Sequence, residues 1–143
     1  MAKSTTFSND LALLIFNATA IANIADNAAS SPLTDLYISL HTASPGVGGA
    51  QTTNETAYTN YVRVAVVRSG SGWTVASGGA TNAALIQFAQ CGVTGATITH
   101  VAIGTASSGA GKVLYAGALN SSLAVSNLIQ PQFSISALTA TES

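Results

Sequence analysis

The chain has 143 residues and a formal net charge of −1, and only 6% of its residues are charged. Soluble domains usually carry about 25% charged residues. Four Lys and Arg residues are too few to neutralise a run of phosphates, which argues against nucleic-acid binding. Five carboxylates and two histidines offer little material for a metal or acid–base site, so we expect no catalytic centre, metal or cofactor. The 48% of hydrophobic residues and the low net charge also exclude a disordered chain.

The length suits a single domain. No apolar run approaches the roughly 20 residues that a membrane span needs, so we expect no membrane partner. We expect residues 1–31 to form an N-terminal helix that packs on the domain or anchors it, and residues 32–143 to form a β-sandwich, the two together making one structural domain.

The first predicted element is one helix that runs through most of residues 1–31. Its apolar residues recur at spacings of three and four, a helical period, and are Leu11, Leu14, Ile15, Ala18, Ile21, Ala22 and Ala25. Ser8 is the predicted N-cap, with Asp10 in the first turn, and Ser30-Ser31-Pro32 ends the helix. We expect the apolar stripe to pack on the rest of the domain or on a neighbouring subunit.

After Pro32 the apolar period changes to two, which is typical of strands. Leu36–Leu40 alternates, and Tyr61–Arg68 predicts the clearest strand, with Val62, Val64 and Val66 on one face. Further strands are predicted at Trp73–Val75, Ala84–Ala89, Thr97–Ile103, Val113–Ala118, Ser122–Val125, Gln132–Ile135 and Leu138–Thr141.

Short turn clusters separate these strands, among them Ser69–Gly72, Ser77-Gly78-Gly79 and Ser107–Gly111. Eight or nine short strands with one terminal helix predict a mainly β fold, a single antiparallel sandwich, jelly-roll-like domain or barrel. Parallel crossovers are not expected, because no helices lie between the strands.

One segment invites comparison with a phosphate-binding loop, Gly104–Val113 (GTASSGAGKV). The motif GxxxxGK[ST] needs Gly where this chain has Ala106, and a hydroxyl where it has Val113. No helix pattern follows, so no helix N-terminus would meet the phosphates. We therefore expect an exposed Gly/Ser hairpin loop and no small-molecule substrate.

The candidate bases for nucleophilic catalysis are His41 and His100, and neither lies in a nucleophile-elbow motif. Neither histidine lies at a short zinc-ligand spacing from Cys91. We expect both histidines to be hydrogen-bonded structural residues of a β-protein.

The internal charges of the β region predict an architectural ion pair. Glu55 is expected to pair with Arg63 or with Arg68, within one chain or between subunits, while Asp35 is a further candidate.

The aromatic residues allow two interpretations. A packing role is favoured, and a sugar-stacking platform is the alternative. The residues concerned are Tyr37, Tyr58, Tyr61, Trp73 and Tyr115.

Five short motifs occur in a suggestive order: Leu36–Gly46 (LYISLHTASPG), Tyr61–Val66 (YVRVAV), Thr99–Gly104 (THVAIG), Leu114–Leu119 (LYAGAL) and Pro131–Phe133 (PQF). This order resembles a family of small tailed-bacteriophage virion proteins, many of them labelled tail fibre protein. Those proteins open with a short helix and carry an LYxxLHTxxPG strand and a GxLLYxGxL strand. The N-terminal helix predicted here is longer and richer in Ala and Asn than that pattern.

The resemblance implies a non-enzymatic, β-rich component of the virion. Our main hypothesis is a capsid decoration (cement) protein that bridges capsomers on the capsid exterior, with the major capsid protein and copies of itself, as a dimer or trimer, as partners. The alternative is a tail or tail-fibre component that serves host attachment. Candidate interface or structural residues are Leu11, Leu14, Ile15, Tyr37, His41, Glu55, Tyr61, Arg63, Arg68, Trp73, His100 and Tyr115.

Overall fold

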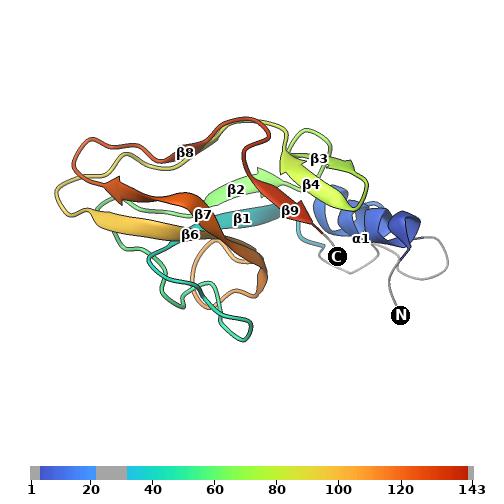
Figure 1. Ribbon diagram of the computed structural model, residues 1–143, viewed down its shortest axis with the longest axis horizontal. Coiled ribbons are helices and arrows are strands. Elements are labelled where there is room, and N and C mark those ends of the chain that lie inside the picture. Colours follow the sequence, from blue (N-terminus) through green and yellow to red (C-terminus); the bar gives the residue numbers. More distant parts are fainter. Residues whose placement is uncertain (1–3, 22–31, 142–143) are drawn as a thin grey trace. The chain divides into compact units, whose positions relative to one another are not determined.

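The computed structural model describes residues 4–21 and 32–141, and the chain divides into two compact units (Figure 1). The first, which we call the helix unit, comprises Met1–Asp35, Val67–Ile86 and Phe133–Ser143. The second, the sheet unit, comprises Leu36–Val66 and Gln87–Gln132. Each unit is described by itself below.

The described chain is mainly β, with 41% strand and 9% helix. Its elements are α1 (Thr5–Asn17), β1 (Asp35–His41), β2 (Val64–Val67), β3 (Trp73–Ala76), β4 (Gly79–Asn82), β5 (Ile86–Gln87), β6 (Ala96–Gly104), β7 (Val113–Val125), β8 (Gln132–Phe133) and β9 (Thr139–Thr141). The strands form three sheets in the orders β2-β1-β6-β7, β3-β4-β9 and β5-β8. The pairings of β1 with β6, β6 with β7, β3 with β4, and β4 with β9 are antiparallel.

The predicted fold class is confirmed at this level: mainly β, antiparallel, with one helix near the N-terminus. None of the sheets described here closes into a barrel. The sandwich or jelly-roll arrangement stays a prediction. In the part of the chain that is described, no helix is long and apolar enough to cross a membrane.

Several strand predictions need correction. The strand predicted at Tyr61–Arg68 is shorter, Val64–Val67. Within it Val64 and Val66 lie on the more buried face, as expected, whereas before it Arg63 is buried and Val62 is exposed. The two strands predicted within residues 113–125 are one strand, β7. The sequence pattern missed β4, whose Gly-Ala-Thr-Asn composition disfavours strands, and pairing with β3 and β9 overrides that preference.

The helix begins and ends at other residues than predicted. Ser4 is the N-cap, because its side-chain oxygen accepts a hydrogen bond from the N–H of Phe7 at 3.2 Å, whereas Ser8 lies inside the helix. The helix ends at Asn17, and Ala18 adopts the left-handed conformation (φ 53°) that closes helix C-termini. The predicted continuation to residue 31 is therefore wrong up to Ile21, and its remainder lies outside the described residues.

The buried face of α1 also differs from the predicted stripe. Ser8, Ala12 and Phe16, spaced four apart, are buried, whereas Leu11, Leu14 and Ile15 are half-buried. The helix packs on β3 and β4, and the ring of Phe16 lies 4.7 Å from that of Trp73.

A tight turn explains why a serine lies on this buried face. Ser77 and Gly78, both at positive φ, form the two-residue turn of the β3–β4 hairpin. A Cβ atom on Gly78 would come within 2.8 Å of the Cβ atom of Ser8, so the contact needs small residues on both sides.

Arg68 binds the last turn of α1 and joins it to the segment at Leu33. Its guanidinium donates three hydrogen bonds of 2.7 Å, to the carbonyl oxygens of Leu14, Ile15 and Leu33. The carbonyls at a helix C-terminus lack intrahelical partners and carry partial negative charge, so a cation stabilises them. Arg68 therefore has a helix-capping role and does not pair with Glu55, one of the two alternatives that the sequence left open.

The core of the sheet unit lies around β1 and β6. Their register pairs Ile38 with Ile103 and Leu40 with Val101, all buried. β1 is buried on both faces, because Ser39 and His41, which point the other way, are also fully enclosed. A central strand thus carries polar side chains in the interior.

The capping role of Arg68 can be tested by Arg68→Ala. We expect the free energy of unfolding of the helix unit to fall by about 2–3 kcal/mol, because two carbonyls at the end of α1 and the carbonyl of Leu33 lose a charged donor. Trp73, the single tryptophan, packs on the helix, so its fluorescence during urea unfolding reports the change. Lys112→Ala, which removes the same charge from an exposed residue, is the control and should stay within about 0.5 kcal/mol. Equal effects of the two substitutions would contradict the capping role.

Candidate functional site

Opposite charges meet in the interior of the sheet unit. The Nε atom of Arg63 lies 2.6 Å from Oε1 of Glu55, and its Nη2 atom lies 2.7 Å from Oε2, a bidentate pair. The side chains are only 3% and 16% exposed, respectively. Hydrogen bonding to the Glu55 carboxylate raises the pKa of Arg63, so its charge is retained.

The same guanidinium holds the loop of residues 105–111. Nη1 of Arg63 donates to the carbonyl oxygen of Ala106, and Nη2 donates to that of Gly109, both at 2.8 Å. Arg63 therefore joins the Glu55 segment to the loop between β6 and β7. All three nitrogens of its guanidinium have partners, as a buried charge requires.

Tyr61 extends this cluster to the central strand. Its hydroxyl donates to Oε1 of Glu55 at 2.9 Å and accepts from the backbone N–H of Leu40 at 3.0 Å. Burial raises the pKa of Tyr61, so the hydroxyl keeps the proton that it donates. We call Glu55, Tyr61 and Arg63 the Glu55 cluster.

His41 lies next to the Glu55 cluster, since its backbone forms an isolated bridge with Glu55. Its Nδ1 atom is 2.9 Å from the carbonyl oxygen of Thr53, and its Nε2 atom is 2.9 Å from Oγ of Ser39. A carbonyl can only accept, so Nδ1 carries the proton and Nε2 accepts from the serine hydroxyl. Burial lowers the pKa of His41, so the ring is neutral at pH 7.

Ser39 and His41 have the spacing of a nucleophile and its base, but both are fully buried, at 0% exposure. A substrate carbonyl cannot reach Oγ of Ser39 in this arrangement. The group that orients the imidazole is a backbone carbonyl, whereas hydrolytic triads use a carboxylate. The pair therefore fastens β1 to the Thr53 segment.

The side chain of a buried glutamine packs against Gly104–Val113, the segment that was compared with a phosphate-binding loop. Gln51 is 0% exposed, and its side chain accepts from the N–H of Ala106 at 3.0 Å and donates to the carbonyl of Tyr37 at 3.4 Å. A Cβ atom on Gly104 or Gly111 would lie about 2 Å from this side chain. The glycines of this segment make room for Gln51.

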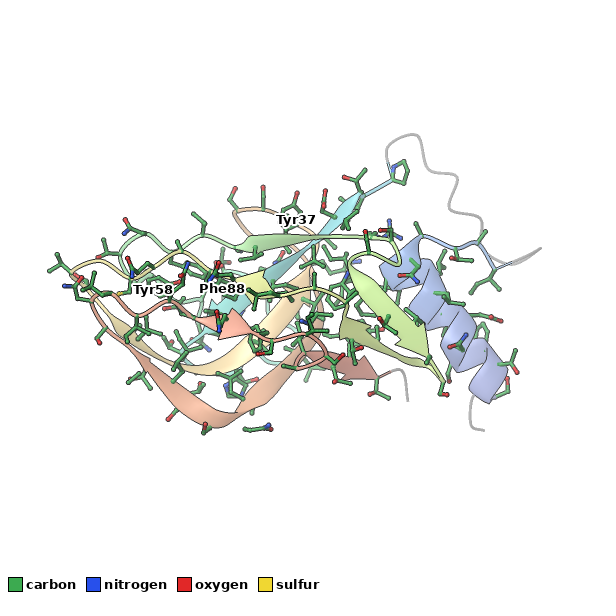
Figure 2. The ribbon with its side chains drawn as sticks, turned by 90° about the horizontal axis from the view of Figure 1, so that it is seen from above. Tyr37, Tyr58 and Phe88 are labelled. Atoms are coloured by element: carbon green, nitrogen blue, oxygen red, sulfur yellow. The ribbon has the colours of Figure 1, made fainter. Side chains whose placement is uncertain are left out.

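The buried aromatic residues have packing roles. Tyr58 is 2% exposed and donates its hydroxyl to the carbonyl of Ala89 at 2.9 Å, while burial raises its pKa to about 12. Its ring lies 5.3 Å from that of Tyr61, which stacks on Phe88 at 6.3 Å. Tyr58 and Phe88 are labelled in Figure 2. Trp73 is fully buried in the helix unit, so neither it nor Tyr58 offers a face on which a sugar could stack.

The remaining predicted residues do not gather into one site. Tyr37 and Tyr115 are half-buried strand residues, the former labelled in Figure 2. His100 is the register partner of His41 on β6, and its Nδ1 atom contacts Oγ1 of Thr99 at 2.8 Å. Arg68, Trp73 and the predicted residues of α1 belong to the helix unit. Within residues 4–21 and 32–141, no three His, Cys, Asp or Glu side chains lie together as metal ligands would.

Two buried amides were not found by sequence reasoning. Gln51 is one; the other is Asn82, whose side chain donates to the carbonyls of Ala84 and Ser134 and accepts from the N–H of Leu138. In a chain so rich in polar uncharged residues, nothing local marks these two as buried. The glycines at the two ends of the 105–111 loop are the one sequence feature that reflects the burial of Gln51.

Residues 6–141 match the family model Gp80, described as podophage GP4 fiber I protein gp80. The chain belongs to this family. The resemblance to phage tail-fibre-type proteins is thereby confirmed, and this member of the Gp80 family is a structural protein of the phage virion. The family description agrees better with the tail-fibre alternative than with capsid cement. A comparison with curated proteins found no match.

Buried, neutral His41 makes stability fall in acid. The unfolded side chain titrates near pH 6.5 and the folded one at lower pH, so between these values the unfolded chain binds a proton that the native chain does not. The free energy of unfolding should therefore drop below pH 6.5, by up to about 1.4 kcal/mol per pH unit. Urea unfolding at pH 7.5, 6.5 and 5.5 measures it.

The His41→Gln variant should lose this part of the pH dependence, whereas His100→Gln should keep it. The wild type and both variants contain the same carboxylates, so acid effects common to all three cancel. If His41→Gln and the wild type lose stability with the same slope between pH 7.5 and 5.5, the account of His41 is wrong.

Proposed function

We propose that the protein is a non-enzymatic structural component of the phage tail fibre, located on the virion tail, where it serves attachment to the host. The observation that carries the proposal is the match to a fibre-protein family over residues 6–141, nearly the whole chain. A match of this extent covers both the helix unit and the sheet unit.

The internal chemistry supports a role without catalysis. The side chains that most resemble catalytic residues are Ser39, His41 and Glu55. Ser39 and His41 are hydrogen-bonded to each other, His41 also bonds to the carbonyl of Thr53, and Glu55 bonds to Arg63. Ser39 and His41 are closed to solvent. These groups fasten loops to strands, which is what a rigid fibre element requires.

The outer chemistry supports assembly with other proteins. With 6% charged residues, contacts of this chain rely on apolar burial and neutral hydrogen bonds, which depend little on salt. Exposed apolar residues such as Val47, Val62, Val93 and Leu128 add surface that an assembly would cover.

The capsid-cement hypothesis rests on the same neutral surface, which suits a head protein and a tail protein equally well. The fibre description of the family supports the tail over the head. A location on the tail fibre is the basis on which the proposal includes a role in host attachment.

Copy number and position in the virion test the proposal together. Purified particles are analysed by quantitative mass spectrometry, with the major capsid protein and a known tail protein of the same particle as internal standards. Gold-labelled antibody against this chain then marks its position in electron micrographs. We expect a copy number close to that of the tail protein and gold at the tail. Hundreds of copies spread over the head would overturn the tail location and restore the cement hypothesis.

A further inference from the structure

Among the strands that the structure describes, the longest lies at a sheet edge. β7 has 13 residues and ends the order β2-β1-β6-β7, so only β6 pairs with it (Figure 1). Figure 2 shows it as the curved outermost strand of that sheet. The opposite edge strand, β2, has only four residues. An edge strand presents alternate N–H and C=O groups that another strand can bind.

Much of this edge strand is open to solvent. Residues 116–118 and 120–124 are exposed, and within the described chain none of them makes a backbone hydrogen bond outside the sheet. Natural edge strands are usually protected by Lys, Pro, inward charges or β-bulges, and β7 contains no Lys, Pro or charged residue. Its pairing with β6 shifts register at two places, between Val113 and Tyr115 and between Ala118 and Leu123. Residues 115–118 pair regularly between these two points.

We propose that residues 116–118 of β7 pair, antiparallel, with the same residues of a second copy across a two-fold axis at Gly117. In this arrangement Gly117 lies opposite Gly117 of the partner subunit, and Ala116 lies opposite the partner's Ala118. The two edges supply the donors and acceptors that each lacks. This inference stands whether the protein lies on the tail or on the head.

Charge explains why a second copy fits this edge. A two-fold antiparallel pair places every residue near a copy of its own neighbours, so any charged residue near the axis would face a like charge. β7 is uncharged throughout, and a net charge of −1 adds little repulsion between copies. Small side chains at residues 116–118 do not obstruct a second strand. A short strand pair buries less than the ~1,200 Å² of a standard interface, so we expect a weak dimer.

Gly117 allows a sharp test, because a Cβ atom there meets nothing within 4 Å and its φ is not positive. Gly117→Lys therefore leaves the single chain intact but places two ammonium groups face to face at the axis. Gly48→Lys, at an equally open glycine with ordinary φ, adds the same charge elsewhere in the sheet unit. Circular dichroism and thermal unfolding establish that both variants are folded.

Sedimentation equilibrium over a wide range of protein concentration measures association. We expect the wild type and Gly48→Lys to approach dimers at high concentration, with Gly117→Lys at least tenfold weaker. A wild type that stays monomeric throughout, or a dimer that Gly117→Lys does not weaken, would overturn the proposal.

Cross-linking locates the contact directly. In opposed strand residues the Cβ atoms lie about 4.5–5.5 Å apart, close to the separation that a disulfide needs. Gly117→Cys should form a covalent dimer under mild oxidation much faster than Gly48→Cys, and the native Cys91 is buried. Equal cross-linking of the two variants, or a trimer in sedimentation, would contradict two-fold pairing at Gly117.

Discussion

The buried ion pair between Glu55 and Arg63 is the interaction on which the sheet unit depends. It joins the Glu55 segment to the 105–111 loop and, through the hydroxyl of Tyr61, to the backbone of Leu40 in the central strand. Removing two charges from water is costly, and their attraction offsets that cost only when the geometry is good and all remaining donors are bound. Here the pair is bidentate and four of the five guanidinium N–H groups have partners, so the loss of one partner would leave an uncompensated charge in the interior.

This use of charge gives the composition a structural meaning. Arg63 and Glu55 neutralise each other inside the sheet unit, and Arg68 caps α1 inside the helix unit. Few charged side chains are then left for the surface of a chain that has nine. A neutral surface has little electrostatic preference among partners and little repulsion between copies. It suits a protein that works among closely packed neighbours, as a virion protein does.

The parts of the fold that follow from local pattern could be predicted from the sequence. β1 and β6 alternate or run apolar in a way that only strands explain, and the scarcity of charge made Glu55 and Arg63 natural partners. The choice of Arg63 over Arg68 depends on tertiary placement, which one sequence does not contain. The same holds for β4, which exists because its neighbours pair with it.

The limits of the helix and the buried amides could not be predicted from the sequence, for related physical reasons. Ser4 and Ser8 have equal intrinsic preference for an N-cap, and the hairpin turn that packs on Ser8 decides between them. Gln51 is buried because the glycines of a distant loop leave room for it. Such long-range complementarity leaves no periodic signal along the chain.

A double-mutant cycle on the Glu55–Arg63 pair tests the central claim most directly. The free energies of unfolding of the wild type, Glu55→Gln, Arg63→Gln and the double variant are measured by urea titration at pH 7.5. We predict that each single substitution costs about 3–5 kcal/mol and that the coupling energy reaches about 2 kcal/mol or more. A coupling energy below about 0.5 kcal/mol, as for an exposed surface pair, would show that the sheet unit does not depend on this interaction.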